Sequence, residues 1–489
     1  MPQLLTLSRA AHLIGVSRGT LQKRIGAGEL PSFDGMVATD DLLRLYPDLR
    51  LEDAGAFEQV ASIKEQAFGK RVRQRMLPSQ EVLAQRLFEQ GRELADLRRH
   101  LARYHALVAD LQGRIATLAS VHPSTGLADL ERRLEEGLSE VLGSEEGPDA
   151  LVAMDAMLRV MAAQVSVRPS GHEFLVEGAE TVLKGALRAG LAPSYGCGNG
   201  TCGLCKARVV SGQTRQVQHS DYPLSGAERE QGYVLLCCHA PVGDVVVEML
   251  EAGSPSDIPE QTVGAKVRAI TPLSDQVSQL HLQTPRTNRL RFLAGQRVSL
   301  GTNLGGVDFA ADYPIASCPC DDRNILFHVA RSADDAFAGR VFDGSLHTGD
   351  TVTIRGPFGD FCLAGEVTGP LVFVACDTGF APVQSLIEHA IALDSGHPIA
   401  LVLASTTPGG HYLAKQARAW ADALDEFSLH GVEAADVAMA AARASEWAAG
   451  AVMPGTRALV AGPSAFVSLV GEALSARFGP ELTVLADPG

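Results

Sequence analysis

The sequence has no long apolar run and little positive charge. Its longest apolar stretches, Leu371–Cys376 and Ile399–Ala404, have the length of buried strands and fall far short of the ~18 residues of a membrane-spanning helix. The N-terminus does not show the charged, apolar and small-residue pattern of a secretory signal. The 57 Asp and Glu outnumber the 42 Lys and Arg, giving a net charge of −15. We therefore expect a soluble cytoplasmic protein that neither enters a membrane nor covers its whole surface with nucleic acid.

Internal repeats with a period of about 20–50 residues are also absent. Hydrophobic residues make up 46% of the 489 residues and charged residues 20%, a composition that can bury several cores and excludes wholesale disorder. The length predicts three or four domains at ~100–200 residues each. The nine cysteines are an odd number, which argues against a disulfide framework in a cytoplasmic chain.

The sequence changes character twice along its length. Residues 1–50 are typical of short helices with sharp turns, and residues 51–163 are typical of helix almost throughout. From residue 164 onward, glycine, proline and short Val/Ile/Leu runs become frequent, which predicts strands first and alternating strands and helices at the end. The expected fold class is a multidomain combination of α+β and α/β units.

Two short helices are expected in the first block. Ala11 and Ile14 share a face of the first, Leu21 and Ile25 share a face of the second, and Gly15 allows the tight turn between them. This pattern is typical of a helix-turn-helix, and residues 1–50 resemble the small DNA-binding domains of the MerR and excisionase type. The residues that the resemblance places against DNA are Arg18, Gln22, Lys23 and Arg24.

Basic residues are unevenly distributed around these two helices. The wing expected over Ser32–Thr39 holds no Lys or Arg, although wings of this family usually carry basic residues for phosphates. The basic run Lys64–Arg75 is either a solvated helix face or a further phosphate contact, so the expected DNA surface extends over residues 1–75. The alternative is a helical module that contacts protein.

A heptad repeat follows within residues 83–118. Its apolar positions alternate in steps of four and three, which favours a helix–helix seam and predicts a homodimer through a coiled coil. Gln90 is the one polar member and would fix the register. The alternative is an amphipathic helix packed within one chain. The repeat consists of Leu83, Leu87, Gln90, Leu94, Leu97, Leu101, Tyr104, Val108, Leu111, Ile115 and Leu118.

The strongest motif is a run of three cysteines, Cys197-x4-Cys202-x2-Cys205. The spacing is that of plant-type [2Fe–2S] proteins, in which thiolates hold two irons. The interspersed glycines allow backbone N–H groups to approach the sulfurs closely. A structural zinc site is the alternative, although zinc usually takes paired C-x2-C knuckles. Cys237 and Cys238 are both candidates for the fourth ligand.

Residues 164–252 resemble a plant-type ferredoxin domain of the β-grasp fold. Strand-like segments at 164–168 and 173–177 and a helix at 181–189 agree with it. The family pattern places the fourth ligand two residues after Leu235, which selects Cys237 and leaves Cys238 as a small buried residue. The ligands that the resemblance implies are Cys197, Cys202, Cys205 and Cys237.

Residues 262–365 resemble the FAD-binding barrel of the ferredoxin–NADP reductase superfamily. Three fragments carry the resemblance: Phe292–Gln296, Ala311–Ser317 and Gly349–Gly359. The family favours FAD over FMN. The resemblance implies that Tyr313 stacks against the isoalloxazine ring, that the backbone of Ile315 and Ser317 bonds the flavin edge, and that Gly356 belongs to the cofactor site.

Residues 366–489 resemble the NAD(P)-binding domain of the same superfamily. The buried strand Leu371–Cys376 runs into the turn Asp377–Pro382, and a second motif follows at Leu459–Pro463. A glycine turn at a helix N-terminus receives the pyrophosphate. The residues that would contact NAD(P)H are Thr378, Gly379, Pro382, Gly462 and Pro463.

Several positions depart from the family motifs. Ala311 replaces the arginine that pairs with flavin phosphate, and Pro314 replaces a hydroxyl residue. Cys376 and Asp377 replace two glycines, and Ala461 replaces the cysteine near the nicotinamide. Flavin phosphate would then need another cation, for which the candidates are Arg331, Arg340 and Arg355.

The order of the parts is that of the reductase components of aromatic-ring and methane oxygenases. The first hypothesis is therefore an iron–sulfur flavoprotein oxidoreductase that passes electrons between NAD(P)H, flavin and a [2Fe–2S] cluster to a protein acceptor. The alternative is a redox-sensing DNA-binding transcriptional regulator built on a reductase-like sensor with degraded catalytic motifs. A weaker third option is a redox partner whose N-terminal block binds protein.

Overall fold

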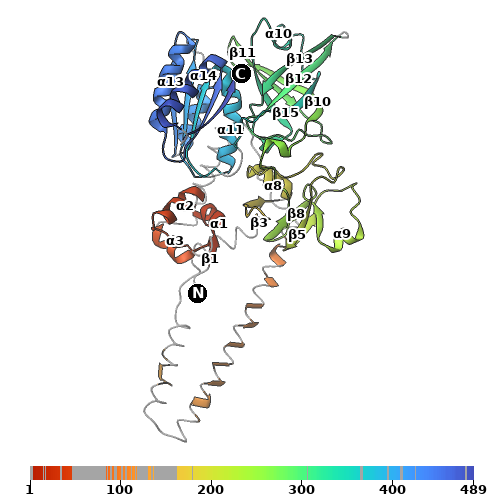
Figure 1. Ribbon diagram of the computed structural model, residues 1–489. Helices are drawn as coiled ribbons and strands as arrows, with labels where there is room; N and C mark the ends of the chain where they lie inside the picture. Colours follow the sequence, from red (N-terminus) through yellow and green to blue (C-terminus); the bar gives the residue numbers. More distant parts are fainter. Residues whose placement is uncertain are drawn as a thin grey trace.

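The computed structural model describes residues 4–46 with short gaps, scattered helical residues between 84 and 136, and residues 162–488 with short gaps. Figure 1 shows an N-terminal head and a body whose three larger sheets have five, six and five strands. Among these described residues, no helix is long and apolar enough to cross a membrane.

The N-terminal head (residues 4–46) has three short helices and a two-stranded ribbon. Its elements are β1 (Leu4–Thr6), α1 (Leu7–Ile14), α2 (Arg18–Gly26), β2 (Met36–Ala38) and α3 (Thr39–Leu45). Ala11 and Leu21 are buried in one hydrophobic core, as their spacing predicts, and β1 pairs antiparallel with β2. Ala162, from the body, lies in the same core. The head therefore packs against the start of the body.

The described helical residues between 84 and 136 include positions of the predicted heptad repeat. Leu87, Leu97, Tyr104 and Leu111 are helical and expose 46–67% of their surface in the single chain. Arg86 is the exception on this segment, because it is buried and donates hydrogen bonds to the carbonyls of Pro241 and Val242. The repeat positions that lie outside the described residues are Leu83, Gln90, Leu94, Leu101 and Leu118.

The cluster unit (residues 162–252) is a mixed sheet covered by one helix. The sheet order is β4-β3-β9-β5-β7, with β3 and β9 parallel, and the short pair β6-β8 lies beside it. The predicted strands and helix of this segment are confirmed. The elements are β3 (Ala162–Arg168), β4 (Glu173–Glu177), α8 (Val182–Arg188), β5 (Lys206–Ser211), β6 (Thr214–Gln216), α9 (Gly226–Glu230), β7 (Tyr233–Leu235), β8 (His239–Pro241) and β9 (Val245–Glu248).

The barrel unit (residues 261–363) is a six-stranded antiparallel sheet of order β13-β12-β15-β10-β11-β14. The Ala316 N–H bonds the Leu326 carbonyl at 2.8 Å, which links the two edges of the sheet. The elements are β10 (Gln261–Pro272), β11 (Val277–Gln283), β12 (Arg297–Leu304), β13 (Val307–Pro314), η3 (Pro319–Asp321), β14 (Asn324–Ala330), α10 (Ala336–Phe342) and β15 (Thr351–Phe358).

The dinucleotide-fold unit (residues 367–488) is a parallel sheet of order β18-β17-β16-β19-β20 with helices on both faces. The predicted buried strand β16 is confirmed, and all six of its residues are buried. The elements are β16 (Leu371–Cys376), η4 (Asp377–Gly379), α11 (Phe380–Leu393), β17 (Ile399–Ser405), α12 (Ala414–Ala423), β18 (Phe427–Glu433), α13 (Val437–Ala451), β19 (Arg457–Gly462), α14 (Ser464–Phe478) and β20 (Thr483–Pro488).

The barrel unit and the dinucleotide-fold unit are joined by polar contacts through α11. The Ser385 hydroxyl donates to the Ser317 carbonyl at 2.7 Å, and the Cys318 N–H donates to the Glu388 carboxylate at 3.1 Å. The buried His328 of β14 contacts the Tyr412 hydroxyl at 3.1 Å. Helix α11 faces the barrel in Figure 1. The two units are therefore fixed against each other at the end of the sheet where a dinucleotide is expected.

Candidate redox centres

The cysteine loop of the cluster unit directs its backbone amides at its own sulfurs. Cys197 Sγ accepts from the N–H groups of Asn199, Thr201 and Cys202 at 3.3–3.5 Å. Cys202 Sγ accepts from the N–H groups of Cys197 and Leu204 at 3.4 and 3.5 Å. Burial raises the pKa of Cys197, but the hydrogen bonds that it accepts outweigh this and lower the pKa to about 6. The loop thus stabilises a thiolate, the form that binds iron.

The other two predicted ligands, Cys205 and Cys237, lie next to each other. A hydrogen bond links the thiols of Cys205 and Cys237, and it raises the pKa of Cys205. Cys237 Sγ is also 3.6 Å from Cys238 Sγ, whereas Cys238 Sγ reaches the His219 carbonyl at 3.6 Å. Cys238 is fully buried. The structure therefore brings the four predicted cysteines into one region, with Cys238 packed behind Cys237.

Two glycines are required by the close approach of neighbouring atoms. Gly200 has φ +87°, and a Cβ atom there would lie 2.7 Å from Cys238 Sγ. Gly203 has φ +77°, and a Cβ atom there would lie 2.3 Å from the Tyr222 ring. Residues other than glycine rarely adopt this backbone conformation. The loop could not wrap so tightly with side chains at these positions.

The donor set fits a binuclear cluster. Thiolates that receive backbone N–H bonds are the environment in which protein iron–sulfur clusters are held. Across the described residues, no three His, Cys, Asp or Glu side chains are grouped so that they could hold a single metal ion. Cys202 and Cys197 are linked by a backbone N–H bond to Cys197 Sγ, and Cys205 interacts with both Cys237 and Cys197.

The residues predicted to hold a flavin are already engaged within the barrel unit. Tyr313 is 7% exposed, and its ring centroid lies 5.6 Å from that of Phe337. The Ile315 N–H donates to the Gln296 carbonyl at 3.0 Å, and Ser317 Oγ accepts from the Leu326 N–H at 3.2 Å. The Tyr313 ring is thus packed against Phe337, and the Ile315 N–H already has an acceptor. These groups match a flavin site only in part.

Asp335 is a residue of this region that the sequence motifs missed. Its carboxylate accepts from the N–H groups of Phe337 and Ala338, both at 2.9 Å, and so caps α10. The Tyr313 hydroxyl also donates to this carboxylate, and burial together with Asp335 raises the pKa of Tyr313. An acidic residue immediately before a helix is a recognisable capping signal, but its pairing with Tyr313 is a tertiary contact that no local pattern contains.

Gly356 and the three candidate cations for the flavin phosphate also contact other residues of the chain. Gly356 lies in β15, where a Cβ atom would be 3.0 Å from Val298 Cγ1. Among the three candidate cations, Arg331 stacks over the Phe342 ring at 4.3 Å, and Arg340 is buried with its guanidinium bonded to Thr302. Arg355 pairs with Glu260. Arg331 and Arg340 therefore have partners within the barrel unit, and Arg355 has one in the residue that precedes β10.

The predicted nicotinamide residues converge at the carboxyl ends of two neighbouring strands. Thr378 and Gly379 follow β16 in η4, Pro382 lies in the first turn of α11, and Gly462 and Pro463 end β19. A Cβ atom on Gly379 would lie 2.3 Å from the Ala461 carbonyl oxygen, and one on Gly462 would lie 2.9 Å from Cys376 Cβ. This is the edge of a doubly wound sheet where dinucleotides bind.

Asp377, which replaces a family glycine, adopts the glycine-like backbone and places its carboxylate at this edge. It is the one described residue other than glycine with positive φ, at +51°. Its carboxylate accepts from Ser405 Oγ at 3.2 Å, and from the N–H and hydroxyl of Thr406 at 3.1 and 2.7 Å. The carboxylate therefore points to the end of β17 rather than into open space.

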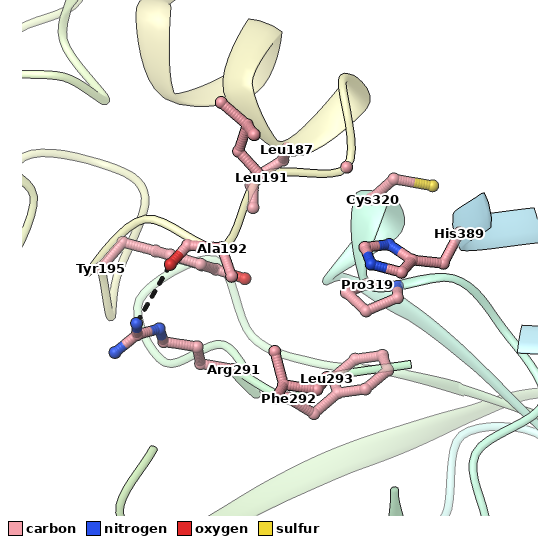
Figure 2. A pocket seen from close by; sticks show the side chains of 11 residues that line it. Leu187, Leu191, Ala192, Tyr195, Arg291, Phe292, Leu293, Pro319, Cys320 and His389 are labelled. Carbon is pink, nitrogen blue, oxygen red and sulfur yellow. Dashed lines mark hydrogen bonds between the residues drawn. The ribbon is translucent and has the colours of Figure 1, made fainter. Parts of the chain in front are cut away.

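The three units of the body meet around one small pocket (Figure 2). Leu187, Leu191 and Tyr195 of the cluster unit face Phe292 of the barrel unit and His389 of α11 across it. Its volume is about 10 Å³, enough for about one water molecule. Burial lowers the pKa of His389 to about 4, so the side chain is neutral. The junction is thus closely packed and too small for a cofactor.

Two of the predicted DNA-contacting residues face acidic groups of this chain. Lys23 Nζ lies 2.8 Å from the Glu426 carboxylate of the dinucleotide-fold unit. Arg24 lies 3.4 Å from the Glu29 carboxylate and 5.2 Å from the Tyr46 ring centroid. Gln22 is exposed, and the side chain of Arg18 lies outside the described residues, as does the basic run Lys64–Arg75.

Comparisons with known proteins agree with the two redox units. A family model described as "2Fe-2S iron-sulfur cluster binding domain" matches residues 165–242, and one described as "Oxidoreductase FAD-binding domain" matches residues 264–362. The chain is 32% identical over 229 residues to "Phenol 2-monooxygenase, reductase component DmpP" of Pseudomonas sp. (strain CF600), covering 46% of this chain and 64% of the relative, which is just under two thirds.

Two further relatives are covered over a larger share of their length. The first is "CDP-6-deoxy-L-threo-D-glycero-4-hexulose-3-dehydrase reductase" of Yersinia pestis, 30% identical over 53% of this chain and 77% of the relative. The second is "Propane 2-monooxygenase, reductase component" of Mycolicibacterium smegmatis, 27% identical over 50% of this chain and 70% of the relative. The names of these three relatives all describe a reductase or a reductase component.

The adjacent buried residues Cys237 and Cys238 make different contacts. We predict that Cys237→Ala loses the visible absorption and the iron content of the purified protein, because Cys237 shares its hydrogen bond with Cys205. Cys238→Ala keeps both, because Cys238 Sγ is directed at the His219 carbonyl. Loss of iron in the Cys238 variant together with its retention in the Cys237 variant would contradict this assignment.

Proposed function

Because the chain belongs to the family of reductases that join a [2Fe–2S] domain to an oxidoreductase FAD-binding domain, we propose that it is an iron–sulfur flavoprotein oxidoreductase. It passes electrons from NAD(P)H through flavin and a [2Fe–2S] cluster to a protein acceptor. The observation that supports this most directly is the loop in which three backbone N–H groups converge on Cys197 Sγ. A bound flavin accepts a two-electron hydride and releases single electrons, which a cluster carries one at a time.

The residues of the chain have separate tasks in this proposal. Cys197, Cys202, Cys205 and Cys237 hold the cluster, with amides of the same loop stabilising the charge of Cys197 and Cys202. Tyr313 offers the aromatic ring on which a flavin stacks. The turn that contains Thr378 and Gly379 and the end of β19 receive the dinucleotide. The junction between the three units is closely packed, and its pocket has room for about one water molecule.

The proposal is tested by adding NADH under anaerobic conditions to the purified holoprotein and recording its visible spectrum. We expect the flavin and cluster bands to bleach, and cytochrome c to be reduced when it is added. Bands that stay oxidised with NADH and with NADPH, but bleach with dithionite, would contradict electron transfer from a nicotinamide.

A matched variant separates the two redox groups in this test. Cys205→Ala removes one proposed cluster ligand from the cluster unit and leaves the barrel unit unchanged. We expect this variant to keep the reduction of its flavin by NADH and to lose the reduction of cytochrome c. Unchanged cytochrome c reduction would show that electrons leave the protein without passing through the cluster.

We further propose that the chain forms a homodimer through the heptad positions of residues 83–118. The support is that Leu97 and Tyr104 expose 60% and 67% of their surface in a single chain, and that an apolar seam of this period is covered by a second helix. Leu97→Glu should give a monomer by light scattering. The control is Leu107→Glu, an exposed position outside the repeat, which should stay dimeric. A wild-type monomer would contradict the proposal.

A second candidate function is a redox-sensing DNA-binding transcriptional regulator. It is supported by the core that α1 and α2 form in the head together with Ala162 of the body, and by the position of α2, whose Lys23 pairs with Glu426 of the redox body. A phosphate would compete with Glu426 for Lys23, which would connect DNA binding to the arrangement of the two units.

This second function predicts a specific footprint on DNA from the protein's own promoter region. Glu426→Gln should strengthen binding about threefold, because it frees Lys23 for a phosphate. Lys23→Ala should weaken binding on every sequence and lower the salt dependence of log K by about one. A gel-shift titration at several salt concentrations measures both effects. The absence of any footprint, or equal binding by the wild type and both variants, would contradict this function.

A further inference from the structure

A guanidinium from the barrel unit lies against the cysteine loop. Arg289 belongs to the segment between β11 and β12, and its backbone N–H donates to the Gly196 carbonyl at 3.1 Å. A Cβ atom on Gly198, the residue after Cys197, would lie 2.9 Å from both Cζ and Nε of Arg289. All three atoms nearest to that position belong to Arg289. The guanidinium therefore occupies the space beside Gly198.

The side chain of Arg289 is held from behind by a buried carboxylate. Its Nη1 lies 2.7 Å from Asp322 Oδ1, and the two side chains are 18% and 6% exposed. Tyr195 of the cluster unit lies beside the same carboxylate and is buried. A planar guanidinium in a two-sided contact of this kind has little freedom to move. Arg289 thus joins the cysteine loop to the barrel unit at a fixed place.

One donor of Arg289 is left for the loop. Its Nε is buried and has no hydrogen-bond partner among the described residues, and it is one of the atoms closest to Gly198. An unpaired buried N–H is costly unless a partner is supplied. A guanidinium stays protonated under all ordinary conditions. A permanently charged guanidinium with a free Nε–H donor therefore lies beside Gly198, the residue after Cys197.

Resting on the function proposed above, we propose that Arg289 is a positioning residue for electron transfer between the barrel unit and the cluster. It fixes the cysteine loop against the barrel unit, and its charge favours the reduced, more negative form of the cluster. Hydrogen bonds and charges around the sulfurs are the means by which a protein sets the midpoint potential of a cluster.

Arg291 provides a matched control on the same segment. Its Nη2 donates to the Ala192 carbonyl of the cluster unit at 3.2 Å, so it also joins the two units (Figure 2). It lines the small pocket at the junction, and no atom of Arg291 is among those nearest to Gly198. Replacing Arg291 therefore removes an equal charge and an equal contact between the units without altering the surroundings of Gly198.

The test is the midpoint potential of the cluster in the full-length holoprotein, measured by a redox titration of its absorption and EPR signals. The double variant Arg289→Met with Asp322→Asn is compared with the single variant Asp322→Asn, because both lack the Asp322 charge and they differ only in the charge of Arg289. We expect the equilibrium constant for one-electron reduction to be about tenfold lower in the double variant than in the Asp322→Asn variant, which is about 59 mV. Arg289→Lys keeps a positive charge and should retain most of the wild-type potential.

The controls make the outcome specific. Arg291→Met should leave the potential within about a third of the shift seen in the double variant. The inference is overturned if the double variant has the potential of the Asp322→Asn variant, or if Arg291→Met lowers the wild-type potential by the same amount. A wild-type protein that contains no cluster would instead contradict the proposed function, and absorption and iron analysis detect that case before any titration.

Discussion

The structure depends on backbone amides that point at sulfur. Cys197 Sγ accepts from three N–H groups of its own loop, and this arrangement is open only to a chain with glycines at the sharp turns. A buried thiolate would be expensive without such donors, because burial alone raises the pKa of a thiol. At Cys197, hydrogen bonds from the Thr201 side chain and from the amides of Asn199 and Cys202 reverse that effect and lower the pKa. The mixed sheet and the helix α8 therefore hold the cysteine loop in a single conformation.

The contacts of this loop extend beyond the cluster unit. Arg289 reaches it from the barrel unit, and Arg291 bonds the neighbouring segment at Ala192. The barrel unit is in turn fixed to the dinucleotide-fold unit through Ser385 and Glu388 of α11. Short-range bonds thus connect the cysteine loop to the edge of the parallel sheet. Such rigid connections suit electron transfer, which needs fixed distances between redox groups.

Two carboxylates distinguish this chain within its fold. Asp335 caps α10 and accepts from Tyr313, and Asp377 bridges η4 to the end of β17. Asp377 replaces a glycine of the family motif, whereas Asp335 lies outside the motifs and contacts the predicted flavin residue Tyr313. Both carboxylates accept hydrogen bonds from donors of the chain itself.

The sequence predicted the elements whose signals are local. The cysteine spacing, the strand β16 and the apolar faces of α1 and α2 are periodic or short-range features, and the structure contains them. Contacts between distant segments could not be predicted in this way. Gly379 was expected to serve a pyrophosphate turn, yet its lack of a side chain is also required by the Ala461 carbonyl on a neighbouring strand. Arg289 belongs to no motif, because its role arises only when two units pack together.

The central claim is that the four thiols hold a binuclear iron–sulfur cluster. Metal and sulfide analysis of the protein purified without oxygen, combined with EPR after one-electron reduction, tests this claim most directly. We expect about two irons and about two inorganic sulfides per chain, and an EPR signal from one unpaired electron in the reduced protein. About one zinc per chain, with no inorganic sulfide and no visible absorption, would contradict it.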